Sequence, residues 1–304
     1  KPTTYPHRMY HIPLRRKASL EVSLIIWYFI TMNIRKSILA GTWYPENPDQ
    51  LAGIVDGYLV GESAKPSAIV VPHAGYKYSG ATAGFGYGCL VGHSWKRIVI
   101  LAPNHQHWLD AASVPLDFSA YETPLGSVAL DVDAMNELDD CNAVNPVSAA
   151  HAEEHSIEIQ LPFLQRVFKK IPPVVPILIP RLNQKQRDAL VQVMSRWTDT
   201  LFIVSTDFTH YGKDFGFAPF NGDLKQQIRD LDYGAIDAIL NRDSAALLDY
   251  EQETGITMCG LQATALMLQL PVGKAKLLDY SRSGDSNNDY SFSVSYASIA
   301  LGEL

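Results

Sequence analysis

The chain is 304 residues long and 47% hydrophobic, and it carries a formal net charge of −7 at pH 7. Such a chain can bury the core of one large domain or two small ones. The acidic balance, with no stripe rich in lysine and arginine, argues against nucleic acid as a partner, because phosphate binding requires a basic face. The cysteines, Cys89, Cys141 and Cys259, are widely spaced without a CxxC motif, so we expect no disulfide framework and a reducing, cytoplasmic location.

An apolar run, "VSLIIWYFI", lies at 22–30 between basic residues. It is far shorter than the roughly 20 residues of a transmembrane helix, so we do not expect a membrane protein, although a weak anchor is the alternative. No small-residue cleavage site follows the run, as a signal peptide requires. The sequence from Met32 reads like the start of an ordinary soluble protein. We therefore predict an N-terminal extension outside the fold over 1–31 and one domain over 33–304.

Short β-branched apolar runs alternate with segments of helical periodicity from residue 68 onward. This alternation predicts an α/β fold, a single layered domain with a central, mostly parallel or mixed sheet flanked by helices. Four of the runs, 68–71, 97–101, 174–179 and 201–205, are nearly continuously hydrophobic, as is typical of strands that are covered on both faces. The predicted strands are 68–71, 97–101, 174–179, 201–205, 274–281 and 291–301, and the predicted helices are 81–91, 154–169, 184–197, 222–240 and 259–269.

Histidine-bearing loops directly follow three of the predicted strands. "AIVVPHAGYKYSG" contains His73, "RIVILAPNHQH" contains His105, and "LFIVSTDFTHYG" contains Asp207 and His210. Ligands bind to open α/β sheets at the edge where the carboxyl ends of parallel strands meet, so we expect these side chains to converge. Each alone is an ordinary loop residue, but three such loops in one sheet favour a site. An acid near an imidazole can orient it or serve as a ligand itself.

Cys259 opens the predicted helix 259–269, in "ITMCGLQATALMLQL". One interpretation is plain packing, since free cysteine is among the most buried residue types. A second is a ligand that joins two imidazoles around zinc, copper or iron. A third is a nucleophile with His210 as its base and Asp207 as the orienting acid. The dipole of the helix would favour the thiolate in the last two cases, and the residues alone leave all three open.

An acidic segment, "HAEEHSIEIQLPFL", spans 151–164. Glu153 and Glu154 suit the positive end of a helix dipole, which is one interpretation of the segment. In the other, His155 faces the cleft together with Glu158, three residues later.

Seven motifs occur in order along the chain: "LAGTWYP", "PHAGYKYSG", "LAPNHQ", "EEHSIEIQLPFL", "VSTDFTHYG", "MCG" and "VSYASIAL". Together they resemble the motifs of the Memo family, whose prokaryotic members are called AmmeMemoRadiSam system protein B. The resemblance covers essentially all of 37–304. It implies a fold similar to that of class III, LigB-type extradiol dioxygenases, which hold a mononuclear non-haem iron.

The resemblance also implies a metal centre. His73 of "PHAGY", His105 of "APNH" and Cys259 of "MCG" match the metal ligands of the family, so one iron(II) or copper ion per chain is expected. The dioxygenases complete their ligand set with a carboxylate. A thiolate in that place lowers the potential of iron and favours copper(I), so ring-cleaving activity does not follow from the resemblance.

Further residues are assigned by the resemblance to the surrounding pocket. Asp207 and His210 match a pocket acid and a histidine at the position of the dioxygenases' catalytic base. His155 matches a motif near the site. Trp43 and Tyr44, in the first motif, are candidate pocket residues, with core packing as the alternative.

The resulting expectation is a metal-binding, dioxygenase-like redox protein that acts on a small-molecule or peptide ligand. The prokaryotic gene context of the family implies radical-SAM and AMMECR1-type partner proteins. One alternative is a non-catalytic scaffold that binds a peptide or protein in the same cleft, and another is a cysteine- or metal-dependent hydrolase.

Overall fold

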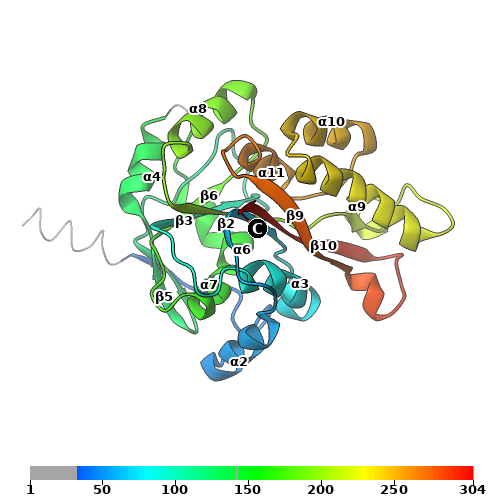
Figure 1. The fold of residues 1–304 in the computed structure, drawn as a ribbon, viewed down its shortest axis with the longest axis horizontal. Coiled ribbons are helices and arrows are strands. Elements are labelled where there is room, and N and C mark those ends of the chain that lie inside the picture. The colour runs from blue at the N-terminus through cyan, green and yellow to red at the C-terminus, as the bar shows by residue number, and fades with distance from the viewer. Residues whose placement is uncertain (1–32, 142, 304) are drawn as a thin grey trace, which may run out of the picture.

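The computed structural model describes residues 33–141 and 143–303 (Figure 1). They form an α/β fold with a mixed sheet flanked by helices, as predicted, and this architecture is consistent with a LigB-like fold. The predicted extension, 1–31, lies outside the described residues and stays a prediction. Within the described chain, no helix has both the length and the apolar character needed to cross a membrane.

A seven-stranded sheet forms the centre of the described chain. Its strand order is β6-β3-β7-β2-β10-β8, and β9 pairs with β10. The pairs from β6 to β2 are parallel, whereas β10 runs antiparallel to β2, β8 and β9. The strands are β2 (Lys65–Val71), β3 (Arg97–Ala102), β6 (Val174–Leu178), β7 (Thr200–Ser205), β8 (His210–Tyr211), β9 (Lys274–Arg282) and β10 (Ser293–Glu303). A second, three-stranded sheet contains β1 (Ile34–Arg35), β4 (Ala120–Thr123) and β5 (Gly126–Ala129).

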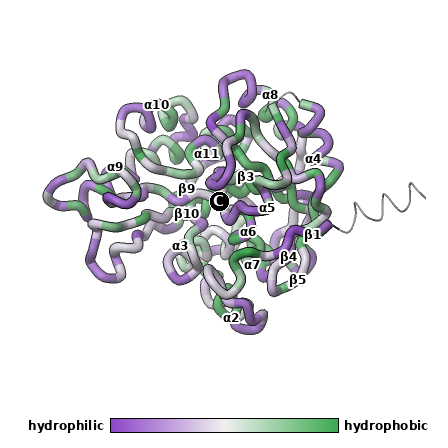
Figure 2. Tube along the Cα trace, turned by 180° about the vertical axis from the view of Figure 1, so that it is seen from behind, coloured by the Kyte–Doolittle hydropathy of each residue, from purple (hydrophilic) through white to green (hydrophobic). Residues whose placement is uncertain are grey.

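The parallel strands owe their continuous hydrophobicity to burial on both faces. Every residue of 68–71 and of 98–102 is fully buried. Figure 2 shows the same contrast along the chain, with hydrophobic strands inside and hydrophilic outer loops. Burying one Val, Leu or Ile side chain stabilises a fold by roughly 1.5–3 kcal/mol, so these strands supply much of the core's stability.

Helices cover both sides of the large sheet. Figures 1 and 2 show α8, α10 and α11 on one side and α2, α3 and α7 on the other. The helices are α2 (Pro48–Tyr58), α3 (Tyr76–Gly88), α4 (Val132–Asp139), α5 (Ser148–Glu153), α6 (His155–Glu158), α7 (Leu161–Val167), α8 (Gln184–Met194), α9 (Leu224–Leu240), α10 (Ser244–Thr254) and α11 (Leu261–Met267).

Some helices differ from their predictions. The predicted helix 154–169 is two short helices, α6 and α7, with an interruption at Ile159 and Gln160. Pro162 lies in the first turn of α7, where proline favours a helix start, and the Glu154 side chain caps the start of α6. The predicted helix 259–269 begins only at Leu261, so Cys259 precedes it. Helix α2 was not predicted, although Asn47 before Pro48 is a helix start signal, and the Asn47 side chain does accept the N–H of Gln50.

The register of the sheet aligns the ends of the strands that carry the histidine loops. Val71 of β2 pairs with Ser205 of β7, and Leu101 of β3 pairs with Val204 of β7. The carboxyl ends of β2, β3 and β7 therefore lie at one edge of the sheet, offset from one another by about one residue. The predicted convergence of the three loops is therefore confirmed.

Candidate metal centre

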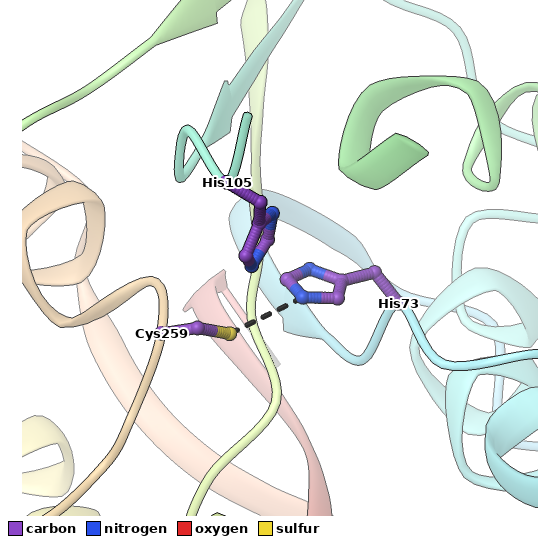
Figure 3. A group of neighbouring side chains, drawn as sticks. All are labelled: His73, His105 and Cys259. Carbon is purple, nitrogen blue, oxygen red and sulfur yellow. Dashed lines mark hydrogen bonds between the residues drawn. The ribbon is translucent and has the colours of Figure 1, made fainter. Parts of the chain in front are cut away.

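His73, His105 and Cys259 come together at this edge of the sheet, with their side chains pointing toward one another (Figure 3). Their donor atoms all lie within 4.8 Å of one another. The Cys259 Sγ is 3.2 Å from His73 Nε2, and the ring centroids of His73 and His105 are 5.3 Å apart. Tertiary folding thus brings together the three side chains that the resemblance implied as ligands.

The hydrogen bonds of Ser205 determine which nitrogen of His73 faces the thiol. Ser205 Oγ donates to the Ser156 carbonyl at 2.6 Å and accepts from Gln160 Nε2 at 2.8 Å. A hydroxyl has one proton and a carbonyl can only accept, so His73 Nδ1, 3.0 Å from Ser205 Oγ, must be the donor. The lone pair is therefore on His73 Nε2, at Cys259. Burial and the neighbouring imidazoles lower the pKa of His73 well below its usual range, which keeps the ring neutral.

Glu154 determines which nitrogen of His105 donates, as Ser205 does for His73. Its Oε1 lies 2.9 Å from His105 Nδ1, and its Oε2 accepts the backbone N–H of His105 at 2.7 Å. Burial opposes ionisation of this carboxyl, but hydrogen bonding and charge from His105 and His155 lower the pKa of Glu154 to about 2. An ionised carboxylate can only accept, so Nδ1 donates, and the tautomer of the neutral ring has its lone pair on Nε2. The predicted role of Glu154 at a helix N-terminus is also confirmed, since Oε1 accepts the N–H groups of His155 and Ser156.

Cys259 reaches the loop after β7 because a glycine follows it. A Cβ at Gly260 would lie 2.5 Å from Thr206 Cβ, a distance too short for two carbon atoms in contact. The Gly260 N–H donates to Thr206 Oγ1 at 2.9 Å. The Asp207 N–H donates to Cys259 Sγ at 3.2 Å. Burial, and next the charge of Asp207, raise the pKa of Cys259 above its usual range. The expected stabilisation of the thiolate by the helix N-terminus does not prevail, because burial and the charge of Asp207 outweigh it and α11 begins only at Leu261.

The nucleophile–base pair of Cys259 and His210 is not formed in the described structure. The imidazole within hydrogen-bond distance of Cys259 Sγ belongs to His73. A thiol with a raised pKa is also a weak nucleophile at neutral pH. The geometry therefore favours a ligand role for Cys259 over the nucleophile role.

Asp207 and His210 occupy one loop but have different partners. Asp207 Oδ1 accepts the N–H of His73 at 2.8 Å, and burial raises the pKa of Asp207 to about 6. His210 Nδ1 lies 3.0 Å from the carbonyl oxygens of Phe208 and Thr257, so it must donate to them. The imidazole of His210 is thus oriented by carbonyls, while Asp207 holds the loop of His73. His210 Nε2 is left as a proton acceptor.

A cleft of about 980 Å³ adjoins the donor atoms, and all predicted site residues except Cys259 line it. Trp43 is 37% exposed, and its ring centroid lies 4.7 Å from that of His155. The His155 ring stacks on His105 at 4.5 Å, and burial lowers the pKa of His155 to about 4. Tyr44 also lines the cleft, but it is 3% exposed and its hydroxyl donates to Glu158. It is therefore both a core residue and part of the cleft wall.

Glu158 does not act in the cleft as the alternative interpretation had it. Its carboxylate forms a buried ion pair with Arg35 and accepts the N–H groups of Ile38 and Leu39. These contacts fasten the segment after β1 to α6. Glu158 is a structural residue.

Comparison with known proteins agrees with this arrangement. A family model described as "Memo-like protein" matches residues 35–300. The chain is 32% identical to a MEMO1 family protein of Thermoplasma volcanium, over 88% of this chain and 97% of that protein. It is 33% identical to one of Aquifex aeolicus, over 87% and 98%, and 30% identical to the "Protein memo-1 homolog" of Caenorhabditis elegans, over 88% and 82%. The chain belongs to the Memo family.

The donor set of this Memo-family chain suits a metal ion. Two imidazoles and a thiol are ligands for borderline or soft metals, and the partners of both Nδ1 atoms select the tautomers in which Nε2 is the acceptor. A cation would offset the cost of ionising a buried thiol. His105, Glu154 and His155 form a second group of potential donors, but Glu154 already accepts hydrogen bonds on both oxygens and acts as a support for His105.

Sequence reasoning missed the residues that orient the histidines. Ser205 and Gln160 were not singled out, and Glu154 was considered only as a helix cap. A signal was present, because Ser205 ends the apolar run "LFIVS" and Gln160 interrupts the apolar "IEIQLPFL". The side chains of Ser205 and Gln160 are buried, and buried polar groups require specific hydrogen-bond partners.

Proposed function

We propose that this Memo-family protein binds one iron(II) or copper ion per chain through His73, His105 and Cys259. We further propose that it acts as a dioxygenase-like oxidoreductase on a small-molecule or peptide ligand in the adjoining cleft. Cleavage of an aromatic ring is not part of the proposal, since the third donor is a thiol in place of a carboxylate.

One observation carries the proposal. Ser205 and Glu154 accept from Nδ1 of His73 and His105, which selects Nε2 as the acceptor nitrogen of each neutral ring, and the donor atoms of both rings lie within 4.8 Å of the Cys259 sulfur. Hydrogen bonds of this kind orient metal-bound histidines and raise their basicity. A packing role for these side chains would not require this proton arrangement on both rings.

The remaining site residues have roles that follow from their contacts. When bound, the metal would supply Lewis acidity and redox chemistry at its open positions. His210 lines the cleft and can accept a proton at Nε2 from a ligand hydroxyl or amide, because its Nδ1 is committed to two carbonyls. Asp207 holds the backbone of His73 in place.

Metal analysis of the full chain, purified without chelator, tests the proposal. We expect about one equivalent of iron or copper, and none in His73→Ala or His105→Ala. His107→Ala is the matched control, because His107 lies two residues from His105 but bonds to Glu153 outside the donor group. Zinc as the sole bound metal would overturn the redox role, and full metal content in the His73 and His105 variants would overturn the site.

The size of the cleft supports a second candidate function, a scaffold that binds a peptide without turnover. Its volume of about 980 Å³ reaches the upper end of the roughly 300–1,000 Å³ found for small-molecule pockets. Copurification of a peptide with metal-free protein would favour this function over the first.

Radical-SAM and AMMECR1-type proteins are the proposed partner proteins, on the family resemblance.

A further inference from the structure

Two phenylalanine rings face solvent at the cleft beside His210. Phe215 is 36% exposed and Phe292 is 53% exposed, and both line the cleft. Their rings stack, with centroids 4.7 Å apart and planes at 19°, and the Phe215 centroid is 5.3 Å from that of His210. A pair of exposed aromatic rings at a cavity wall is typical of a surface that a ligand covers.

The loop that carries Phe215 is held in shape by local contacts. Phe215 ends a single 3-10 turn, η1 (Lys213–Phe215), and Gly212 and Phe217 close the loop with two backbone hydrogen bonds of 2.8 and 3.2 Å. Gly212 has φ +144°, and a Cβ there would lie 2.9 Å from the carbonyl oxygen of Ser291. Only glycine lets this loop lie directly against the segment that carries Phe292.

Phe292 lies directly before the strand that pairs with the strand of His210. Ser293 and Val294, which follow Phe292, pair with Tyr211 and His210 in the antiparallel β8–β10 ladder. This ladder limits the movement of Phe292 relative to the imidazole, because groups anchored to regular elements keep their relative positions better than groups on free loops.

The charge of the cleft indicates what kind of ligand it accepts. Among the described lining residues the only cationic side chain besides the histidines is Lys77, whose Nζ lies 4.5 Å from the centroid of the Tyr78 ring. The lining includes the carboxyl of Asp207 and the neutral polar residues Ser286 and Asn287. No arginine offers the two-pronged contact that carboxylate and phosphate groups favour.

We propose that Phe215 and Phe292 form a subsite for an uncharged, flat apolar ring of the ligand, and that this ring positions its substituents at His210 Nε2. A cavity of roughly 150 Å³ already accommodates benzene, so a cleft of about 980 Å³ holds much more than the ring. The ring is one end of a larger ligand whose remainder reaches the donor group. This inference rests on the proposed function only for what happens at the donor group.

Calorimetric titration of the purified full chain with 2-naphthol tests the subsite. A matched probe, 2-naphthalenesulfonate, has the same rings and one negative charge. We expect 2-naphthol to bind about tenfold more tightly than the sulfonate, and Phe292→Ala or Phe215→Ala to weaken its binding about three- to tenfold. Trp108→Ala is the control, because Trp108 is 85% exposed and lies outside the cleft lining, and it should leave the Kd unchanged.

Two further measurements separate the possible failures. Phe292→Leu keeps an apolar side chain without a ring, so it should bind 2-naphthol more weakly than the parent chain even if an alanine variant fails to fold. The metal content of the same samples reports on the proposed function independently, and metal-free parent protein would count against that function alone. Unchanged 2-naphthol binding in the folded ring variants, or equal binding of the sulfonate, would overturn the subsite.

Discussion

Ser205 Oγ lies 3.0 Å from His73 Nδ1 and decides which nitrogen of that ring is free. The hydroxyl gives its one proton to the Ser156 carbonyl, so the imidazole must donate to it. A serine at the end of a core strand therefore sets the proton position of a residue on the neighbouring strand's loop. Which nitrogen of His73 faces Cys259 as an acceptor depends on this contact.

Ser205→Ala should weaken metal binding about 10- to 100-fold, because His73 loses the group that fixes its ring and tautomer. Competition with a chelator of known affinity measures the change. Ser298→Ala is a suitable control, since Ser298 is a buried serine of the same sheet whose hydroxyl has no hydrogen-bond partner in the structure. Equal metal affinity in the two variants would remove Ser205 from the site.

Thiol labelling should show whether Cys259 is a ligand. We expect slow alkylation with metal bound and faster alkylation after chelation, because coordination occupies the sulfur. The rate after chelation should rise toward alkaline pH, since burial raises the pKa of the thiol. Cys89 and Cys141 serve as internal controls. Identical labelling with and without metal would indicate that Cys259 only packs in the core.

Cys259→Ser should weaken binding of copper(I) more than binding of iron, since a hydroxyl is a poor ligand for a soft ion.

His210→Ala should retain the metal, because the His210 ring is held by two carbonyls and is not part of the donor group. Any metal-dependent oxygen consumption should fall by roughly 10²- to 10⁴-fold if the residue is a general base. Mass spectrometry of the metal and an oxygen electrode measure the two effects on one sample. Loss of metal from this variant would instead make His210 a ligand.

Acid should destabilise the fold through His151. This side chain is buried between the Ser113 carbonyl and the Tyr121 hydroxyl, and burial lowers its pKa to about 3. The pKa of a histidine in the unfolded chain is near 6.5. Between pH 6.5 and 3, His151 is therefore protonated in the unfolded chain but not in the folded chain, and this favours unfolding. The resulting stability loss develops between pH 6.5 and 3 and should reach about 2–3 kcal/mol at pH 4.5.

Urea unfolding at pH 7 and pH 4.5 measures this loss. His151→Gln is the matched variant, because the glutamine amide also offers an N–H donor and an acceptor oxygen but does not titrate in this range. The variant should be less stable at pH 7 and lose less stability on acidification. The same pH dependence in both chains would show that other groups cause the acid sensitivity.

The sequence was sufficient to predict the parallel strands and the loops that follow them. Runs such as 68–71 and 98–101 are apolar throughout, and a strand covered on both faces buries such a run completely. The placement of His73, His105 and Asp207 at one edge follows from that pattern alone. Family motifs, also read from the sequence, added Cys259 to the group.

Local patterns failed where a distant contact decides the structure. The stretch 154–169 was predicted as one helix, yet it is interrupted at Ile159 and Gln160, between α6 and α7. The Gln160 side chain, at this interruption, donates to Ser205 Oγ, 45 positions away in the chain. Periodicity reports only which face of a segment is apolar, so it contains no signal for such a contact.

The chemistry of the site was decided only by the tertiary structure. Cys259 could have paired with His210 or His73, and the fold placed its sulfur 3.2 Å from His73, 186 positions away. The protonated nitrogens of His73 and His105 depend on Ser205 and Glu154, which come from other segments of the chain. Proton position is set by which acceptors lie within about 3 Å, and that is a property of packed side chains that no single segment of the sequence carries.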